Sequence, residues 1–102
     1  MDGWGVFNNN KGLRYEGMWK DGSYHGNGTL FSEYEDKYVG NFFNGMKKGY
    51  GILYYLDDNS KFKGTWENGQ KHGYGIFFDG DGVMRKQVWD KGELVDSVDD
   101  CG

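Results

Sequence analysis

The chain repeats one pattern of aromatic, glycine and polar positions every 23 to 24 residues. In each copy an aromatic residue, a glycine and a second aromatic residue occupy alternate positions, and a polar-Gly step and two further glycines follow. The copies read Tyr15, Gly17, Trp19, Gly22, Gly26, Gly28; then Tyr38, Gly40, Phe42, Gly45, Gly49, Gly51; then Phe62, Gly64, Trp66, Gly69, Gly73, Gly75. Alternation at period two predicts strands, because successive side chains of a strand point to opposite faces.

A turn signal separates the two strands that each copy predicts. Asp21-Gly22, Asn44-Gly45 and Asn68-Gly69 are dipeptides typical of tight β-hairpins. Repeats of this length stack on their neighbours, because one unit cannot bury its apolar surface alone. The sequence therefore predicts an all-β fold, a linear array of consecutive antiparallel β-hairpins that form one elongated twisted sheet. The composition agrees, with 19 glycines, no proline and an aromatic content of 19%.

The boundaries of the units follow from the same frame. Residues 3–14 match the closing half of a unit, and full units span residues 15–37, 38–61 and 62–84. Residues 85–92 keep only Trp89 and Gly92, with Gln87 in a position that is glycine elsewhere, so they are predicted to be a decayed cap. The array is thus expected over residues 1–92, with residues 93–102 forming an acidic C-terminal tail.

The paired glycines need a physical reason, because glycine weakens the interior of a strand. We expect Gly26 and Gly28 to make room for rings from neighbouring strands, such as Tyr15, Trp19 or Tyr38. The aromatic residues of the first strands are then predicted to form the core of a thin array. They are Tyr15, Trp19, Tyr38, Phe42, Phe62 and Trp66.

The repeated frame resembles the MORN repeat (membrane occupation and recognition nexus) over about residues 3–92. The resemblance implies consecutive hairpins with a groove along them, and roles in scaffolding, cytoskeletal attachment or membrane proximity. Phe42 in place of Trp and Phe62 in place of Tyr keep the volume of the ring. Some members of this family precede a catalytic domain, so an accessory repeat domain of a larger enzyme is the weakest of the alternatives considered.

Charge and cysteine content narrow the range of partners. The formal net charge is −4, and residues 79–102 hold the whole excess of acid. An acidic chain is a poor ligand for nucleic acid and for anionic membranes. Cys101 is the single cysteine, so an internal disulfide is excluded, and neither a signal segment nor an apolar run of membrane-spanning length is present. We expect a cytoplasmic protein, with cytoskeleton or membrane association as further expectations.

Residues that could carry chemistry are better explained as structure. His25 and His72 occupy the same repeat position, so they are expected in a turn rather than in a metal site. The segment Asp79-Gly80-Asp81-Gly82 has too few oxygen ligands for a calcium loop and is predicted to be a polar connection. The sequence thus predicts no enzyme, no cofactor and no metal site.

The best candidates for a binding surface are the aromatic residues on the second strand of each hairpin. Tyr50, Tyr54, Tyr74 and Phe78 repeat along one face, where they could line a groove for a protein or peptide segment. Lys47, Lys48 and Lys71 are expected to form a small basic row along one edge. The preferred prediction is a non-catalytic interaction or scaffold module, and the alternative is recognition of acidic phospholipid through these lysines. Free edge strands also make an end-to-end homodimer a prediction.

Overall fold

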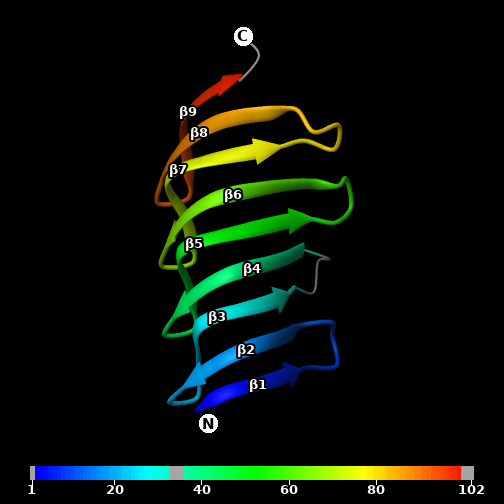
Figure 1. Cartoon of the computed structure of the whole chain (residues 1–102), viewed down its shortest axis with the longest axis vertical. Helices are drawn as coiled ribbons and strands as arrows, with labels where there is room; N and C mark the ends of the chain where they lie inside the picture. Colours follow the sequence, from blue (N-terminus) through cyan, green and yellow to red (C-terminus); the bar gives the residue numbers. More distant parts are fainter. Residues whose placement is uncertain (1, 33–35, 100–102) are drawn as a thin grey trace.

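The computed structural model describes residues 2–32 and 36–99, and within these ranges the fold is all-β (Figure 1). The described residues form nine consecutive strands: β1 (Gly3–Asn8), β2 (Arg14–Lys20), β3 (Ser23–Phe31), β4 (Asp36–Phe43), β5 (Met46–Tyr55), β6 (Ser60–Glu67), β7 (Gln70–Phe78), β8 (Met84–Asp90) and β9 (Glu93–Asp99).

The strands form one open sheet whose spatial order is the order of the sequence. Each strand pairs antiparallel with the next, so β1 and β9 lie at opposite ends of an elongated body of 48 × 24 × 18 Å (Figure 1). This arrangement confirms the predicted linear array of antiparallel hairpins.

The tight turns of the hairpins have the backbone conformation that the polar-Gly steps predict. Asn44 and Gly45 have φ values of 50° and 83°, and the other turns repeat this pair of positive angles. Two consecutive residues with positive φ define a type I′ turn, whose twist matches that of paired strands. The four pairs are Asp21-Gly22, Asn44-Gly45, Asn68-Gly69 and Lys91-Gly92.

The array extends beyond residue 92, where the sequence frame stops. Residues Glu93–Asp99 were predicted to belong to an acidic tail, but they form β9 and pair with β8. Trp89 lies opposite Leu94, as Trp19 lies opposite Tyr24 in the first hairpin. The Lys91-Gly92 turn closes this fourth hairpin, so the decayed cap is one strand of a complete unit. Cys101 lies outside the described residues.

A row of glycines crosses the sheet and supports the rings of the core. The row runs through directly opposed positions of β1 to β7: Gly5, Gly17, Gly28, Gly40, Gly51, Gly64 and Gly75. A methyl group on Gly28 would lie 2.6 Å from Cε1 and Cζ of Tyr15, well inside van der Waals contact. The Tyr38 ring covers Gly51 in the same way, and the Phe62 ring covers Gly75.

The predicted role of paired glycines is correct for the second glycine of each pair and wrong for the first. Gly26 has a φ of 76°, and a methyl group there would meet only Met18, at 3.7 Å. Gly49 and Gly73 also have positive φ, at 84° and 93°. These glycines lie where the register of each hairpin shifts, so they permit a β-bulge instead of making room for a ring.

The core is the predicted one, with a small adjustment at its first hairpin. Trp19 is only partly buried, against five buried rings. The buried rings are those of Tyr15, Tyr38, Phe42, Phe62 and Trp66. Tyr38 meets Phe42 edge-to-face at 5.0 Å and Trp66 at 5.3 Å, which links two hairpins. Each such pair contributes about 0.5–1.5 kcal/mol beyond the burial of its area. The Tyr38 hydroxyl donates to the Asn41 carbonyl at 3.0 Å, so its polar end is satisfied.

Backbone hydrogen bonds fasten the second, third and fourth turns to the preceding hairpin. The Gly45 amide donates to the Tyr24 carbonyl at 2.9 Å, and the Gly69 amide donates to the Lys47 carbonyl at 3.0 Å. Gly92 repeats the contact with Lys71 at 2.8 Å. This recurring contact fixes the register between hairpins at the end where the turns lie.

Candidate partner-binding face

The sheet has two faces of different character. We call the face that carries Tyr15, Tyr38 and Phe62 the ring face, because the buried rings gather there. We call the opposite face, which carries Tyr50 and Tyr74, the open face. No second layer of described residues covers the open face, since all nine strands belong to one sheet.

Tyr50 and Tyr74 are the most prominent aromatic residues in the central part of the open face. Tyr74 is 80% exposed and Tyr50 is 54% exposed, whereas the core rings are at most 5% exposed. The two tyrosines line a hollow of about 480 Å³ between β5 and β9. Thr65, Ile76 and Val88 contribute to its wall, together with the bare backbone of the glycine row. The hollow is thus an open, mostly apolar surface on a rigid sheet.

Tyr54 and Phe78 lie on the same face but are half-buried under lysine side chains. Lys37 Nζ lies 4.9 Å from the centre of the Tyr54 ring, and Lys61 Nζ lies 5.0 Å from that of Phe78. A second hollow of about 350 Å³ borders Tyr54, Lys61 and Phe78 near the connecting loops. All four predicted aromatic residues therefore share one face, in two groups.

The three predicted lysines do not share a face. Lys47 Nζ lies on the ring face, 5.4 Å from the centre of the Tyr38 ring and 5.3 Å from that of the Trp66 ring. Lys71 Nζ lies 4.3 Å from the centre of the Trp89 ring and donates to the Tyr55 hydroxyl at 2.8 Å. Lys47 and Lys71 recur at equivalent positions of adjacent hairpins, but they pack on core rings. The predicted basic row of three lysines is therefore wrong.

Burial changes the acidity of the two lysines on the ring face. It lowers the pKa of the Lys47 ammonium, and the carboxylate of Asp36 partly offsets the shift. Burial also lowers the pKa of Lys71, and the charge of Lys47 lowers it further. Each ammonium lies between rings of adjacent hairpins, so these residues belong to the packing between units.

Lys48 lies on the open side of its strand, where its Nζ is 3.6 Å from a carboxylate oxygen of Glu67. Lys47 and Lys48 are consecutive residues of β5, so they point to opposite faces. The alternation of side chains along a strand could have separated the two lysines from the sequence. The prediction overlooked it because it assigned both residues to a turn. Of the predicted lysines, only Lys48 therefore shares a face with the aromatic residues.

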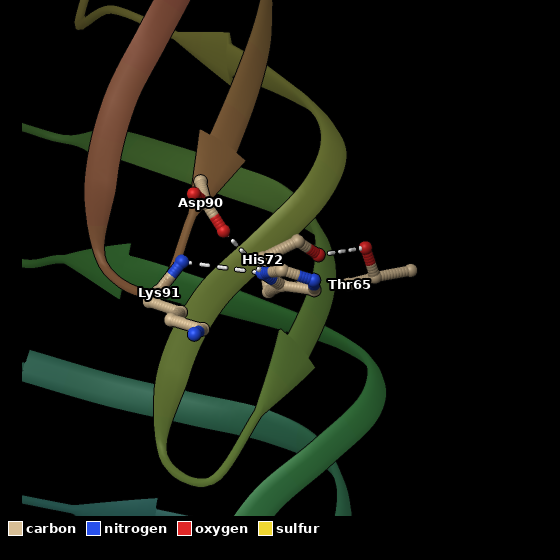
Figure 2. A network of polar contacts seen from close by, with 4 residues as sticks. All are labelled: Thr65, His72, Asp90 and Lys91. Carbon is tan, nitrogen blue, oxygen red and sulfur yellow. Dashed lines mark hydrogen bonds and ion pairs between the residues drawn. The ribbon is translucent and has the colours of Figure 1, made fainter.

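A polar network at the third and fourth hairpins joins Thr65, His72, Asp90 and Lys91 (Figure 2). The Lys91 amide donates to Nδ1 of His72 at 3.1 Å, and an oxygen of Asp90 lies 3.5 Å from the same nitrogen. The Thr65 hydroxyl donates to the backbone carbonyl of His72 and not to its ring. A catalytic hydroxyl would have to donate its proton to the base, and the Thr65 hydroxyl does not donate to the His72 ring. The network instead fastens the bulge of β7 to the last turn.

The loop at Asp79 also has a structural explanation. Its carboxylate accepts the amides of Asp81 at 2.9 Å and of Val83 at 3.0 Å, which closes a tight connection. Asn9 accepts the amides of Lys11 and Leu13 in the corresponding loop after β1. Within residues 2–32 and 36–99, no group of three His, Cys, Asp or Glu residues is placed to hold a metal ion.

Comparison with known families decides what kind of array this is. The MORN repeat model matches residues 15–32, 38–60 and 62–84, which is more than half of the chain. The chain belongs to the MORN repeat family. The three matches correspond to the hairpins β2–β3, β4–β5 and β6–β7, and each contains the ring, glycine and turn positions described above.

MORN repeats are non-catalytic modules that generally serve in interaction and scaffolding. No curated protein matches the chain. In the described part of this MORN array, no helix is long and apolar enough to cross a membrane. The hairpin β8–β9 lies outside the family matches, although it continues the same sheet.

Proposed function

We propose that this MORN array is a protein–protein interaction or scaffold module that binds an extended partner segment along its open face. The observation that carries the proposal is the exposure of Tyr50 and Tyr74 beside the hollow of about 480 Å³. Tyrosine is enriched among the residues that dominate binding energy, because it offers a large contact area with few rotatable bonds.

The sheet beneath these tyrosines favours binding at low entropic cost. Tyr50 lies opposite Thr65 and Tyr74 lies opposite Val88, in strands that are paired on both sides. The backbone is therefore already ordered before a partner arrives, and only side chains lose freedom on binding. The proposal places the complex in the cytoplasm, with cytoskeletal proteins among the partners.

A peptide selection tests this proposal. Random twelve-residue peptides are selected by display against the wild-type protein, and the affinity of each selected peptide is measured by fluorescence polarisation. We expect Tyr50→Ala/Tyr74→Ala to weaken binding by at least tenfold, about 1.4 kcal/mol. The control Met46→Ala/Leu94→Ala removes two exposed apolar side chains outside the hollow and should leave affinity unchanged. Equal affinity for the wild type and the tyrosine variant would show that the open face is not the binding surface.

Recognition of acidic phospholipid is the competing function, and lysines on the open face favour it. Lys37, Lys61 and Lys63 lie on this face, although the whole chain has a net charge of −4. Binding through exposed lysines weakens as salt screens the charges, whereas contact with tyrosine persists. Sedimentation with phosphatidylserine vesicles at about 150 mM salt would favour the lipid function over the peptide-binding one.

We also propose that two copies associate end to end. Within the described residues, β1 and β9 each pair with one neighbour only, so each has an unpaired edge. Light scattering after gel filtration would give twice the mass of the chain if this is correct, and the mass of one chain if it is wrong.

A further inference from the structure

A ladder of alternating cations and rings crosses the open face. We use the name cation–ring ladder for the directly opposed residues of β2 to β7: Arg14, Phe31, Lys37, Tyr54, Lys61 and Phe78. Cations come from the first strand of each hairpin and rings come from the second. The ladder therefore repeats once per hairpin, and Met84 ends it on β8.

The rings hold the cations of the ladder in place. Lys37 Nζ lies 4.9 Å from the centre of the Tyr54 ring and 6.0 Å from that of Phe31. Lys61 Nζ lies 5.0 Å from the centre of the Phe78 ring, and Lys63 Nζ, which lies beside the ladder, is 5.3 Å from the same point. A cation above an aromatic face is attracted to it, so less side-chain entropy remains to be lost on binding an anion.

The cation–ring ladder is positively charged, and nearby carboxylates compensate only part of that charge. Among the residues that the structure describes, no carboxylate lies within 4.0 Å of the ammonium groups of Lys37, Lys61 or Lys63. Arg14 differs, because its guanidinium lies 3.2 Å from Glu16. The ladder thus suits an anionic partner, with its strongest part between β4 and β7.

The strand spacing beneath the cations fits a polyproline-II partner. Neighbouring strands are about 4.8 Å apart, so cations on alternate strands recur every ~9.6 Å. A polyproline-II helix advances about 9.3 Å in one turn of three residues, which matches this spacing to within ~0.3 Å. A β-strand presents one face at spacings of about 6.6 or 13 Å, and an α-helix repeats a face every ~10.5 Å over seven residues.

We propose that the open face also binds an acidic polyproline-II stretch of the partner, with Asp or Glu at every third residue, that crosses the strands along the cation–ring ladder. This inference rests on the proposed function, because it uses the same face, and it adds contacts that lie four residues along the strands from Tyr50 and Tyr74, about 13 Å away. The carboxylates meet Lys37 and Lys61, and the residues between them pack on Tyr54 and Phe78. Aromatic surfaces bind such helices well, because a polyproline-II segment is already extended and ordered.

Two synthetic peptides of the same composition test the spacing. One repeats Asp-Pro-Pro five times, and the other carries the same residues in blocks, as three Asp, nine Pro, two Asp and one Pro, so that no two Asp residues are three or six positions apart. Affinity is measured by fluorescence polarisation at about 150 mM salt, where exposed charges are already screened. We expect the periodic peptide to bind about tenfold more tightly, because only its carboxylates match the ladder. Equal affinities would overturn the proposal.

Variants of the protein test the residues that the proposal assigns. Lys37→Gln/Lys61→Gln should weaken binding of the periodic peptide about tenfold, since two ion contacts are lost. The matched control Lys11→Gln/Lys20→Gln removes two exposed lysines outside the ladder and should change nothing. Equal losses in both variants would reduce the effect to net charge and overturn the proposal.

The outcomes separate this inference from the proposed function. If display-selected peptides depend on Tyr50 and Tyr74 while the periodic and block peptides bind equally, the ladder is wrong and the interaction face stands. If neither the selected nor the synthetic peptides bind, both proposals fail. If phosphatidylserine vesicles alone bind in a manner that depends on Lys37 and Lys61, the ladder recognises lipid phosphate and the peptide proposal is overturned.

Discussion

The glycine row makes a strong prediction, because a side chain at Gly51 has no space to occupy. A methyl carbon there would lie inside the van der Waals radii of the hydroxyl and two ring carbons of Tyr38, and the ring is 1% exposed. An ordinary contact would require the ring to move away by about 1 Å or more. The opposed Gly40 has no space for a side chain either, because a methyl group there would lie 2.5 Å from the Gly51 Cα.

The expected cost of Gly51→Val follows from this geometry. Inserted bulk in a packed core costs about 1–3 kcal/mol. Displacement of the Tyr38 ring adds part of the ~3–5 kcal/mol that loss of a buried aromatic side chain costs. We therefore expect a loss of about 3–5 kcal/mol, from a total of ~5–15 kcal/mol for a chain of this size. The melting temperature should fall by about 15–30 °C.

Thermal unfolding followed by circular dichroism measures this effect, with two controls. Gly49→Ala places a methyl group near Asn41 at an ordinary 3.7 Å, so only the positive φ should cost, at about 1–2 kcal/mol. In a Tyr38→Leu background, Gly51→Val should cost less, with a coupling of about 2 kcal/mol. A melting temperature within about 5 °C of the wild type, or an undiminished cost in the Tyr38→Leu background, would refute the packing of this ring on glycine.

Three further predictions concern a hydroxyl, an ammonium and a carboxylate. Burial raises the pKa of Tyr38 from 10.0 to about 12, so the stability that its neutral hydroxyl contributes is fully present below about pH 10 and is lost as pH rises toward 12. Urea unfolding at pH 9 and pH 11 should therefore show a smaller change in the free energy of unfolding for Tyr38→Phe than for the wild type. Equal changes in the two proteins would contradict this. Lys71→Met keeps the apolar stem but loses the contacts of the ammonium with the rings and its hydrogen bond to the Tyr55 hydroxyl. The free energy of unfolding in urea should fall by about 1–2 kcal/mol. An unchanged midpoint of urea unfolding would show that Lys71 takes no part in packing. Asp79→Ala should lower the free energy of unfolding by about 1 kcal/mol, because the amides of Asp81 and Val83 lose their acceptor. Added calcium should not shift the melting temperature of the wild type. A calcium-dependent rise that Asp79→Ala abolishes would show that the loop binds the ion.

The hairpins could be predicted because their determinants are local. Asn44 and Gly45 fix a type I′ turn through their own backbone preferences, and the alternation of Tyr38 and Phe42 fixes which face is apolar. The roles of Gly49 and Gly51 could not be told apart from the sequence. Gly49 has a positive φ and Gly51 is covered by a ring, and this difference depends on a register shift that the residue types do not show.

The candidate site was less predictable, because it depends on what neighbouring hairpins place beside each residue. Tyr50 and Tyr74 share a face by strand parity, which the sequence shows. Lys71 packs on Trp89, a residue of the following unit, and that contact follows only from the pairing of β7 with β8. β9 was missed because its residues lack the aromatic and glycine frame, although Lys91-Gly92 supplies a turn before it.

The strand order of the sheet also determines how the molecule responds to force. Because each described strand pairs only with the strands before and after it in the chain, the long axis runs parallel to the hydrogen bonds that join them. Tension applied at the two ends of the described array would load these bonds one ladder at a time, in the manner of a zipper, instead of shearing many together. We expect stepwise lengthening at low force in an optical trap, one hairpin per step, so an array that links two attached partners would act as an extensible connection between them.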